Sequence, residues 1–107
     1  MTNIALNQEK NSIYIVIPAR FASTRLPGKP LLKISSKCII SHVVTRAKIL
    51  AEKLSTIKKV NHVHVIVATD HDDIFNEVNK IHVQCIMTSP ELLNGTERVY
   101  SAIEKIK

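Results

Sequence analysis

The sequence predicts an α/β fold, a parallel sheet with helices on both faces, because strand and helix patterns alternate three times along it. Three apolar runs rich in β-branched residues are typical of strands buried in a parallel sheet, at residues 13–17, 62–69 and 83–87. Three helical patterns follow them in turn, over residues 39–54, 73–80 and 96–106. This alternation implies right-handed crossovers between parallel strands, so the expected unit is βαβαβα.

The first strand and the segment after it carry most of the functional signal. Residues 13–17 form a continuous apolar run, which predicts a strand that is buried on both faces and ends at Pro18. Ala19–Pro30 is expected to be a loop, because prolines and Gly28 punctuate it. Three consecutive units place the strands in spatial order 3-2-1, and ligands bind beyond the carboxyl ends of such strands. The loop is therefore predicted to lie at a ligand-binding edge.

The remaining elements follow from periodicity and capping residues. A single apolar stripe begins at Ile39 and predicts a long amphipathic helix. The second strand, residues 62–69, begins with alternation and finishes fully apolar, and Asp70 or Asp72 is expected to cap the helix after it. Thr88–Gly95 is predicted to be a loop, and the last helix opens directly after it.

Composition restricts the class of protein. The 107 residues are 45% hydrophobic and 22% charged, which suits one small globular domain and excludes disorder by composition. No apolar run approaches the roughly 20 residues of a membrane-spanning helix. Residues 1–12 form a polar extension without an apolar signal-peptide core, which favours the cytoplasm. Cys38 and Cys85 lack metal-ligand spacing and are expected to be small buried hydrophobes.

The excess of positive charge points to a local anionic ligand. The formal net charge is +6, which invites a nucleic-acid interpretation, but aromatic residues are only 4% of the chain. Surfaces that stack nucleic-acid bases need more aromatic residues than this, so no nucleic-acid partner is expected. Five cations fall within one 18-residue stretch, namely Arg20, Arg25, Lys29, Lys33 and Lys37.

The loop after the first strand suits a polyphosphate. Arg20, Arg25 and Lys29 place two guanidinium groups and one ammonium group within ten residues. Arginine binds phosphate oxygens bidentately, while lysine acts as a mobile point charge. The loop is not a Walker loop, because it has one glycine and Pro30 stands where Ser or Thr is required. A solvated basic loop is the alternative explanation of the same residues.

Three blocks of this chain closely resemble the 3-deoxy-manno-octulosonate (Kdo) cytidylyltransferases, or CMP-Kdo synthetases. Ile17–Leu31 matches the nucleotide-binding signature of that family almost throughout. Val67–His71 resembles the end of the family's second strand, and Asn94–Val99 resembles its Gly-Thr-Glu-Arg helix opening. The resemblance covers residues 13–107. It favours Kdo over the sugar of a CMP-sialic acid synthetase, which is the alternative within the same class of enzyme.

The resemblance implies a three-layer, Rossmann-like nucleotidyltransferase fold that uses CTP and Mg²⁺. A Kdo hydroxyl would attack the α-phosphate and release pyrophosphate, a step in lipopolysaccharide synthesis. Arg20 and Lys29 would be the catalytic residues, neutralising charge on the phosphates. The nucleotide-binding residues carried over from the family are Ala19, Arg20, Ser23, Arg25, Lys29, Thr88, Gly95, Thr96 and Arg98.

The resemblance also has limits, which set further expectations. Members of the family are about twice as long, so residues 13–107 correspond to an N-terminal nucleotide-binding half. The Mg²⁺ ligands are expected mostly in the other half, with the sugar-binding and homodimer-forming portions. This truncated chain alone is expected to be inactive, and a non-catalytic remnant is the alternative from a different class.

The chain departs from the family pattern in a longer stretch from Glu52 to His62 and in substitutions at three places. Ser36-Lys37-Cys38 stands in place of Gly-Lys-Pro, and His82-Val83 stands where relatives often have a glycine pair. Ser89 replaces an arginine that relatives often carry after the third strand.

Overall fold

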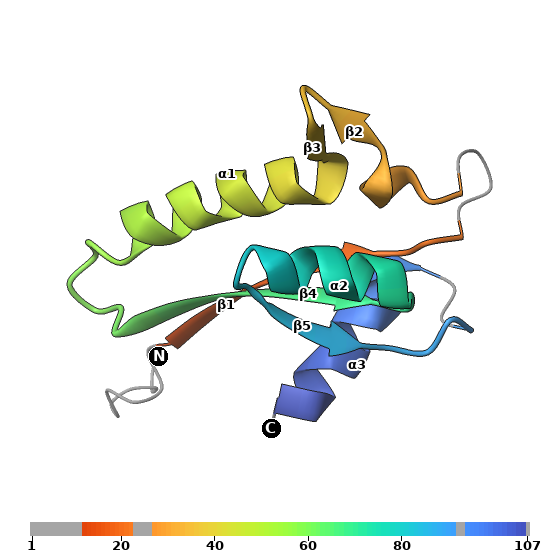
Figure 1. The fold of residues 1–107 in the computed structure, drawn as a ribbon. Coiled ribbons are helices and arrows are strands. Elements are labelled where there is room, and N and C mark those ends of the chain that lie inside the picture. Colours follow the sequence, from red (N-terminus) through yellow and green to blue (C-terminus); the bar gives the residue numbers. More distant parts are fainter. Residues whose placement is uncertain (1–11, 23–26, 92–93, 107) are drawn as a thin grey trace.

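Three parallel strands separate two layers of helix in the computed structural model, which describes residues 12–22, 27–91 and 94–106 (Figure 1). The sheet contains β1 (Ser12–Ala19), β4 (His62–Thr69) and β5 (Gln84–Met87). One face is covered by α1 (Ile39–Leu54) and α2 (Asp72–Lys80), and the other by α3 (Gly95–Ile106). A 3₁₀ helix and a short hairpin connect β1 to α1, and they are η2 (Lys29–Leu31), β2 (Lys33–Ile34) and β3 (Lys37–Cys38).

The strand order confirms the predicted topology. The strands lie in the order β1-β4-β5, which is the expected order 3-2-1. Ala19 is opposite Thr69, and Thr69 is opposite Met87. Because all pairings are parallel, the three carboxyl ends meet at one edge of the sheet, on the right of Figure 1. The α/β class and the helices on both faces are confirmed.

Two predictions about β1 were wrong. The strand does not end at Pro18, which pairs with Ala68 inside the parallel ladder. Proline lacks an N–H group, and an edge strand tolerates it where that group would face away from the sheet. Nor is β1 buried on both faces, since the Tyr14 side chain is 46% exposed. Within the described residues β1 pairs with β4 alone, so one of its edges stays open.

The core lies between the sheet and the two helices α1 and α2. The last four residues of β4, Ile66–Thr69, are fully buried, as the apolar ending of that strand predicted. The predicted stripe of α1 is confirmed in part, because Val44 is buried while Val43 and Leu50 are exposed. The buried cluster on this face consists of Ala19, Cys38, Ile40, Val44, Val67, Ile74, Val78 and Val83.

Both cysteines belong to this packed face. Cys38 is buried, and Cys85 is half-buried against the same cluster, as expected of small hydrophobes. Burial raises the pKa of the Cys38 thiol, with a further contribution from the Glu77 carboxylate. Burial also raises the pKa of Cys85 to about 11. Both thiols are therefore protonated and unreactive near neutral pH.

Two helix starts differ from the sequence prediction. The N-cap of α2 is His71, not Asp70 or Asp72, because its Nδ1 accepts a hydrogen bond of 3.1 Å from the Asp73 amide. The Asp70 side chain instead contacts Phe21 and Arg98, as described below. The last helix begins at Gly95, inside the segment predicted as a loop.

The hairpin β2–β3 was not predicted, because its strands are two residues long and its turn lacks glycine. Ser35 and Ser36 have φ values of 54° and 72°, the left-handed conformation that favours glycine. His82, after the end of α2, has a φ of 59°. Ser36 and His82 are thus the two departures from the family pattern that carry a positive φ. No helix in the described part of the chain is long and apolar enough to cross a bilayer.

Candidate functional site

Two predicted site residues, Arg20 and Lys29, line one cavity at the carboxyl end of β1. Its volume is about 220 Å³. Apart from these two cations the wall is largely apolar, and the lining residues are Ile17, Pro18, Ala19, Arg20, Lys29, Pro30, Ile39, Ile40 and Val43. Charges that lie against apolar walls interact more strongly than charges in open water. The cavity is therefore suited to an anionic group.

The loop conformation brings Lys29 back to the end of β1. The Gly28 amide donates a hydrogen bond of 2.7 Å to the Phe21 carbonyl, which closes the loop on itself. Gly28 has a φ of 74°, and a Cβ there would lie 3.3 Å from Cε1 of Phe21. Both observations confirm that this position needs glycine. Lys29 then opens η2, with Pro30 in its first turn.

The amino terminus of α1 adds a third favourable feature for an anion. Ile39, Ile40 and Val43, in its first turns, form part of the cavity wall. The described N-cap, Cys38, makes no side-chain capping bond to this turn. The partial positive charge at the start of a 16-residue helix thus points to the same cavity as the two cations.

A second hollow lies on the other side of Pro18 and holds Gly95 and Thr96. Its volume is about 610 Å³, and its lining residues are Pro18, Gly95, Thr96, Val99, Tyr100 and Ile103. Because Pro18 borders both hollows, together they follow the open edge of β1. A Cβ on Gly95 would lie 3.3 Å from Cγ of Pro18, so this glycine already approaches a protein side chain closely.

Arg98 and Thr88, both predicted to bind nucleotide, are buried behind this surface. Arg98 is 0% exposed, and its Nη2 lies 3.4 Å from Oδ2 of Asp70. Its Nη1 donates to the Thr88 hydroxyl and, at 3.2 Å, to the Ser89 carbonyl. In this arrangement the guanidinium group is directed to protein atoms. Arg98 therefore joins α3 to the ends of β4 and β5, and does not line the crevice.

The remaining predicted site residues differ in accessibility. Ala19 is buried, and its carbonyl accepts a hydrogen bond of 2.6 Å from the Thr69 hydroxyl. Ser23 and Arg25 lie outside the described residues. The sequence analysis did not assign Thr69 and Asp70 to the site, although both fall within the Val67–His71 block that resembles the family. That block was the signal that could have found them.

The described residues lack a clustered set of metal-ligating side chains. They contain no group of three or more His, Cys, Asp or Glu side chains placed to hold a metal ion. Both carboxylate oxygens of Asp70 are engaged, one by Arg98 and one by the Phe21 amide at 3.0 Å. The expectation that the Mg²⁺ ligands lie mostly in the other half of the family's chain stays a prediction.

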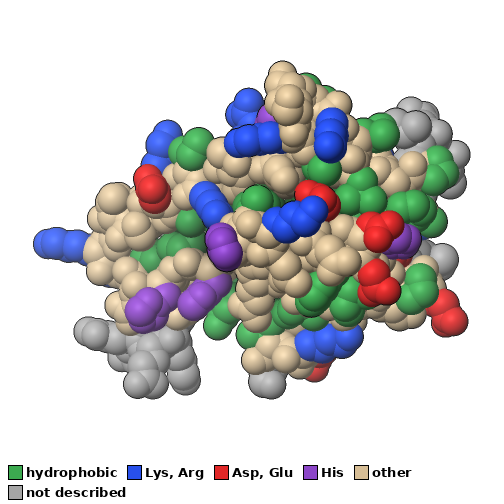
Figure 2. Space-filling view, viewed as in Figure 1, with side chains coloured by type: hydrophobic (Ala, Val, Ile, Leu, Met, Phe, Trp, Pro, Cys, Tyr) green, Lys and Arg blue, Asp and Glu red, His purple; other side chains and the backbone are tan. Residues whose placement is uncertain are grey.

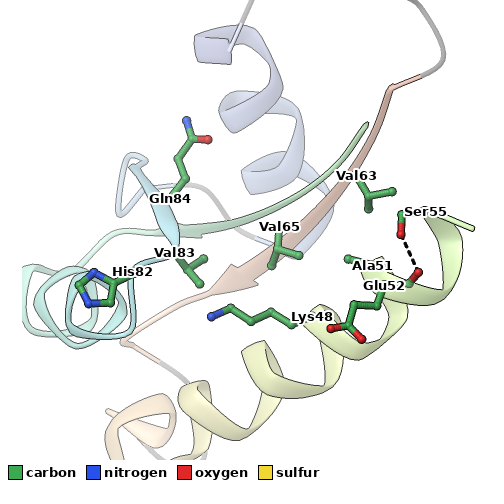
Figure 3. Close-up of a pocket in the computed structure, with 9 residues that line it drawn as sticks. All are labelled: Lys48, Ala51, Glu52, Ser55, Val63, Val65, His82, Val83 and Gln84. Carbon is green, nitrogen blue, oxygen red and sulfur yellow. Dashed lines mark hydrogen bonds between the residues drawn. The ribbon is translucent and has the colours of Figure 1, made fainter. Parts of the chain in front are cut away.

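A separate hollow of about 480 Å³ lies at the opposite, amino end of the sheet (Figure 3). It contains none of the predicted site residues. Lys48 extends across it from α1 and donates to the Ile81 carbonyl at 3.3 Å, while Gln84 points away from it. The Ser55 hydroxyl donates to the Glu52 carbonyl at 2.7 Å. These contacts stabilise helix ends and leave the carboxyl end as the candidate site.

The basic side chains are dispersed over the visible face of the molecule (Figure 2). On the face seen in Figure 2, Lys and Arg side chains lie in separate places among apolar and neutral atoms. On this face they do not merge into one continuous basic block (Figure 2).

Comparisons with known proteins show the family and the fold of this chain. The family model described as cytidylyltransferase matches residues 14–107. A solved structure of CMP:2-keto-3-deoxy-manno-octonic acid synthetase complexed with CTP is similar to this chain, with a TM-score of 0.67 and 35% sequence identity. The similarity covers 90% of this chain and 36% of that chain. The chain therefore spans little more than a third of that protein's length.

Proposed function

The chain belongs to the cytidylyltransferase family, and from this premise we propose that it binds CTP in the crevice along the open edge of β1. The reaction proposed for the protein as a whole is transfer of the cytidylyl group to Kdo. The observation that carries the proposal is the convergence of Arg20, Lys29 and the start of α1 on one cavity. The similar structure was complexed with CTP, which supports the choice of nucleotide.

The volumes suggest how a nucleotide would be divided between the two hollows. Ligand pockets usually measure about 300–1,000 Å³. The cavity at Arg20 and Lys29, at about 220 Å³, is below that range and suits a phosphate tail. The adjoining hollow at Thr96, at about 610 Å³, has room for the base and ribose. Pro18 lies between them and borders both.

The proposed chemistry is a phosphoryl-type transfer that depends on positioning and charge. A Kdo hydroxyl attacks the α-phosphorus, and the bond from that atom to the bridging oxygen breaks as pyrophosphate leaves. Arg20 and Lys29 neutralise the charge that builds up on the leaving phosphates. Mg²⁺, when bound, supplies further neutralisation, and its ligands are proposed to lie mostly outside this chain.

The other carried-over residues have supporting roles in the proposal. Ser23 and Arg25 would hold the triphosphate, and Gly95 and Thr96 would border the base and ribose. Lipopolysaccharide synthesis, a cytoplasmic location and a homodimer of the full-length protein also follow from the resemblance alone. They are parts of the proposal rather than findings.

Calorimetric titration of residues 1–107 with CTP and with CMP tests the binding step. CTP is expected to bind more tightly, because only its outer phosphates reach the two cations. Arg20→Ala and Lys29→Ala should each weaken CTP binding by roughly 1.5–3 kcal/mol, the value of a hydrogen bond to a charged group. The matched control is Lys37→Ala, since Lys37 is an exposed lysine of the hairpin that does not line the cavity.

Equal affinity of the wild type and both cavity variants for CTP would contradict the assignment. The sugar is tested on the protein as a whole by pyrophosphate release, with Kdo compared with sialic acid. Release with sialic acid alone would favour the alternative CMP-sugar synthetase. Binding of CTP without release on any sugar would favour the non-catalytic remnant.

A further inference from the structure

Asp70 is a buried carboxylate that the proposed chemistry does not use. It follows β4 directly, and its side chain is only 5% exposed. It does not cap α2, because His71 does. Buried carboxylates need specific partners, since isolated burial of a charge is costly. The identity of those partners shows what this residue does.

The end of β4 fixes the backbone on both sides of Arg20. Before it, the Ala19 carbonyl accepts a hydrogen bond of 2.6 Å from the Thr69 hydroxyl. After it, the Phe21 amide donates a hydrogen bond of 3.0 Å to Oδ1 of Asp70. The first bond lies at the last ladder pair, Ala19–Thr69, and the second continues the pairing of β1 with β4 beyond it. The backbone of Arg20 is therefore held between two fixed points.

The same contact extends to Lys29 through the loop. The Phe21 carbonyl accepts the Gly28 amide at 2.7 Å, so the Phe21 peptide group links Asp70 to the residue just before Lys29. The Phe21 ring stacks on His71 with centroids 3.8 Å apart and planes 14° apart. Asp70 and His71 thus hold Phe21 by its backbone and its ring. Both cavity cations are adjacent to residues held in this way.

Arg98 holds Asp70 from the opposite side. Its guanidinium group bridges Oδ2 of Asp70 to Thr88 and Ser89, which follow β5. The Thr88 amide and hydroxyl in turn donate to the Thr69 carbonyl at 2.7 Å and 3.1 Å. One buried network therefore joins the ends of all three strands to α3. Asp70, Thr88 and Arg98 in this network line neither of the two hollows.

We propose that Asp70 is a positioning residue, which holds the Phe21 peptide group hydrogen-bonded to Gly28 and thereby aims Arg20 and Lys29 into the cavity. Its hydrogen bond to Phe21 is the contact that acts, and Arg98 keeps its carboxylate in place. The consequence for ligand affinity rests on the proposed function. The effect on the loop itself does not, so the two can be tested separately.

Amide hydrogen exchange, measured by NMR, tests the effect on the loop. Asp70→Ala removes the acceptor for Phe21 and should speed exchange at Phe21 and Gly28 by about tenfold or more, with little change at Val67 in the core. Asp70→Asn keeps an oxygen acceptor and loses the charge, so it should retain most of the protection at Phe21. Equal loss of protection at Phe21 in both variants would show that the charge of Asp70, and not its hydrogen bond, protects this amide. That result would overturn the proposal.

Affinity for CTP supplies the second measurement. Asp70→Ala should weaken CTP binding by roughly tenfold or more and Asp70→Asn by less, whereas CMP binding should change little in either. The control is Asp72→Asn, an exposed carboxylate two residues away that should leave affinity and exchange unchanged. If the wild type fails to bind CTP, the proposed function is wrong, and exchange at Phe21 still decides the role of Asp70.

A variant that leaves Arg98 without its partner can fail to fold, since a buried charge is then uncompensated. Asp70→Ala and Asp70→Asn are therefore also made together with Arg98→Met, which replaces the guanidinium group with an apolar chain. In this background the ordering is expected to persist, with faster exchange at Phe21 for the Ala variant than for the Asn variant. No difference between the two double variants would overturn the proposal.

Discussion

The two faces of the sheet differ in how completely they are covered. The face under α1 and α2 carries the continuous buried cluster that includes Val67, Ile74 and Val78, each fully buried. The face under α3 is open along β1, and Tyr14 and Tyr100 there are 46% and 67% exposed. We call the face under α1 and α2 the closed face, and the face under α3 the open face (Figure 1).

The difference separates the packing that stabilises the fold from the surface that we propose to bind the ligand. The closed face has the dense packing expected to supply most of the free energy of folding. The candidate site lies where that face meets the open edge of β1, and the buried network of Asp70 and Arg98 joins the two there. The closed face thus acts as the rigid support for a site that remains accessible from the open side.

Replacing one isoleucine by alanine on each face should give the largest difference in the free energy of unfolding. Ile74→Ala, in α2 on the closed face, removes a side chain with no exposed area and should lower the free energy of unfolding by about 2–5 kcal/mol. Ile103→Ala, in α3 on the open face, removes a half-buried side chain and should cost about 1 kcal/mol or less. Urea unfolding followed by circular dichroism measures both. Equal losses would mean that α3 is packed as tightly as α2.

The buried thiols of the closed face make the free energy of unfolding depend on pH. Burial raises the pKa of Cys85 to about 11 from an ordinary value of 9.0. Between these two pH values the unfolded chain releases the thiol proton and the folded chain keeps it, so the folded state binds more protons. The free energy of unfolding therefore falls as pH rises through this window, and the contribution is fully present below pH 9.

Cys85→Ala should make the decline in stability between pH 9 and pH 11 shallower, because the titration of Cys85 is removed while that of Cys38 remains. Thermal melts at intervals of half a pH unit measure the slope. For contrast, Ile103→Cys places a thiol on the open face, where iodoacetamide at pH 8 should react with it faster than with Cys85. Equal rates would indicate that the two faces do not differ in accessibility.

Long-period features of the fold were predictable from the sequence. The three strands, their order and the long helix follow from apolar runs such as Ile66–Ala68, because burial on a sheet or a helix face repeats over many residues. The exposure of β1 was not predictable in this way. A continuous apolar run shows that a strand can be buried, and not whether neighbours are present to bury it.

The site was predictable in its charged loop but not in its supporting contacts. Arg20, Lys29 and Gly28 are recognisable from chemistry and motif, and the structure places both cations on one cavity. The pairing of Asp70 with Arg98 joins residues 28 positions apart through three-dimensional contact. An aspartate between a strand and a helix has the local pattern of a cap, so local rules favoured the wrong partner.

The smallest expected effects concern the two positive-φ positions that replace glycine. His82 follows α2 on the closed face with a φ of 59°, and Ser36 lies in the hairpin turn with a φ of 72°. A residue with a Cβ pays about 1–2 kcal/mol in this conformation, while glycine adopts it freely but loses more entropy on folding. His82→Gly and Ser36→Gly should therefore each raise the free energy of unfolding by up to about 1 kcal/mol. The control, His64→Gly within β4, should lower it by about 0.5–1 kcal/mol, because glycine weakens a strand interior. Destabilisation by all three substitutions would show that side-chain contacts of His82 and Ser36 outweigh their backbone strain.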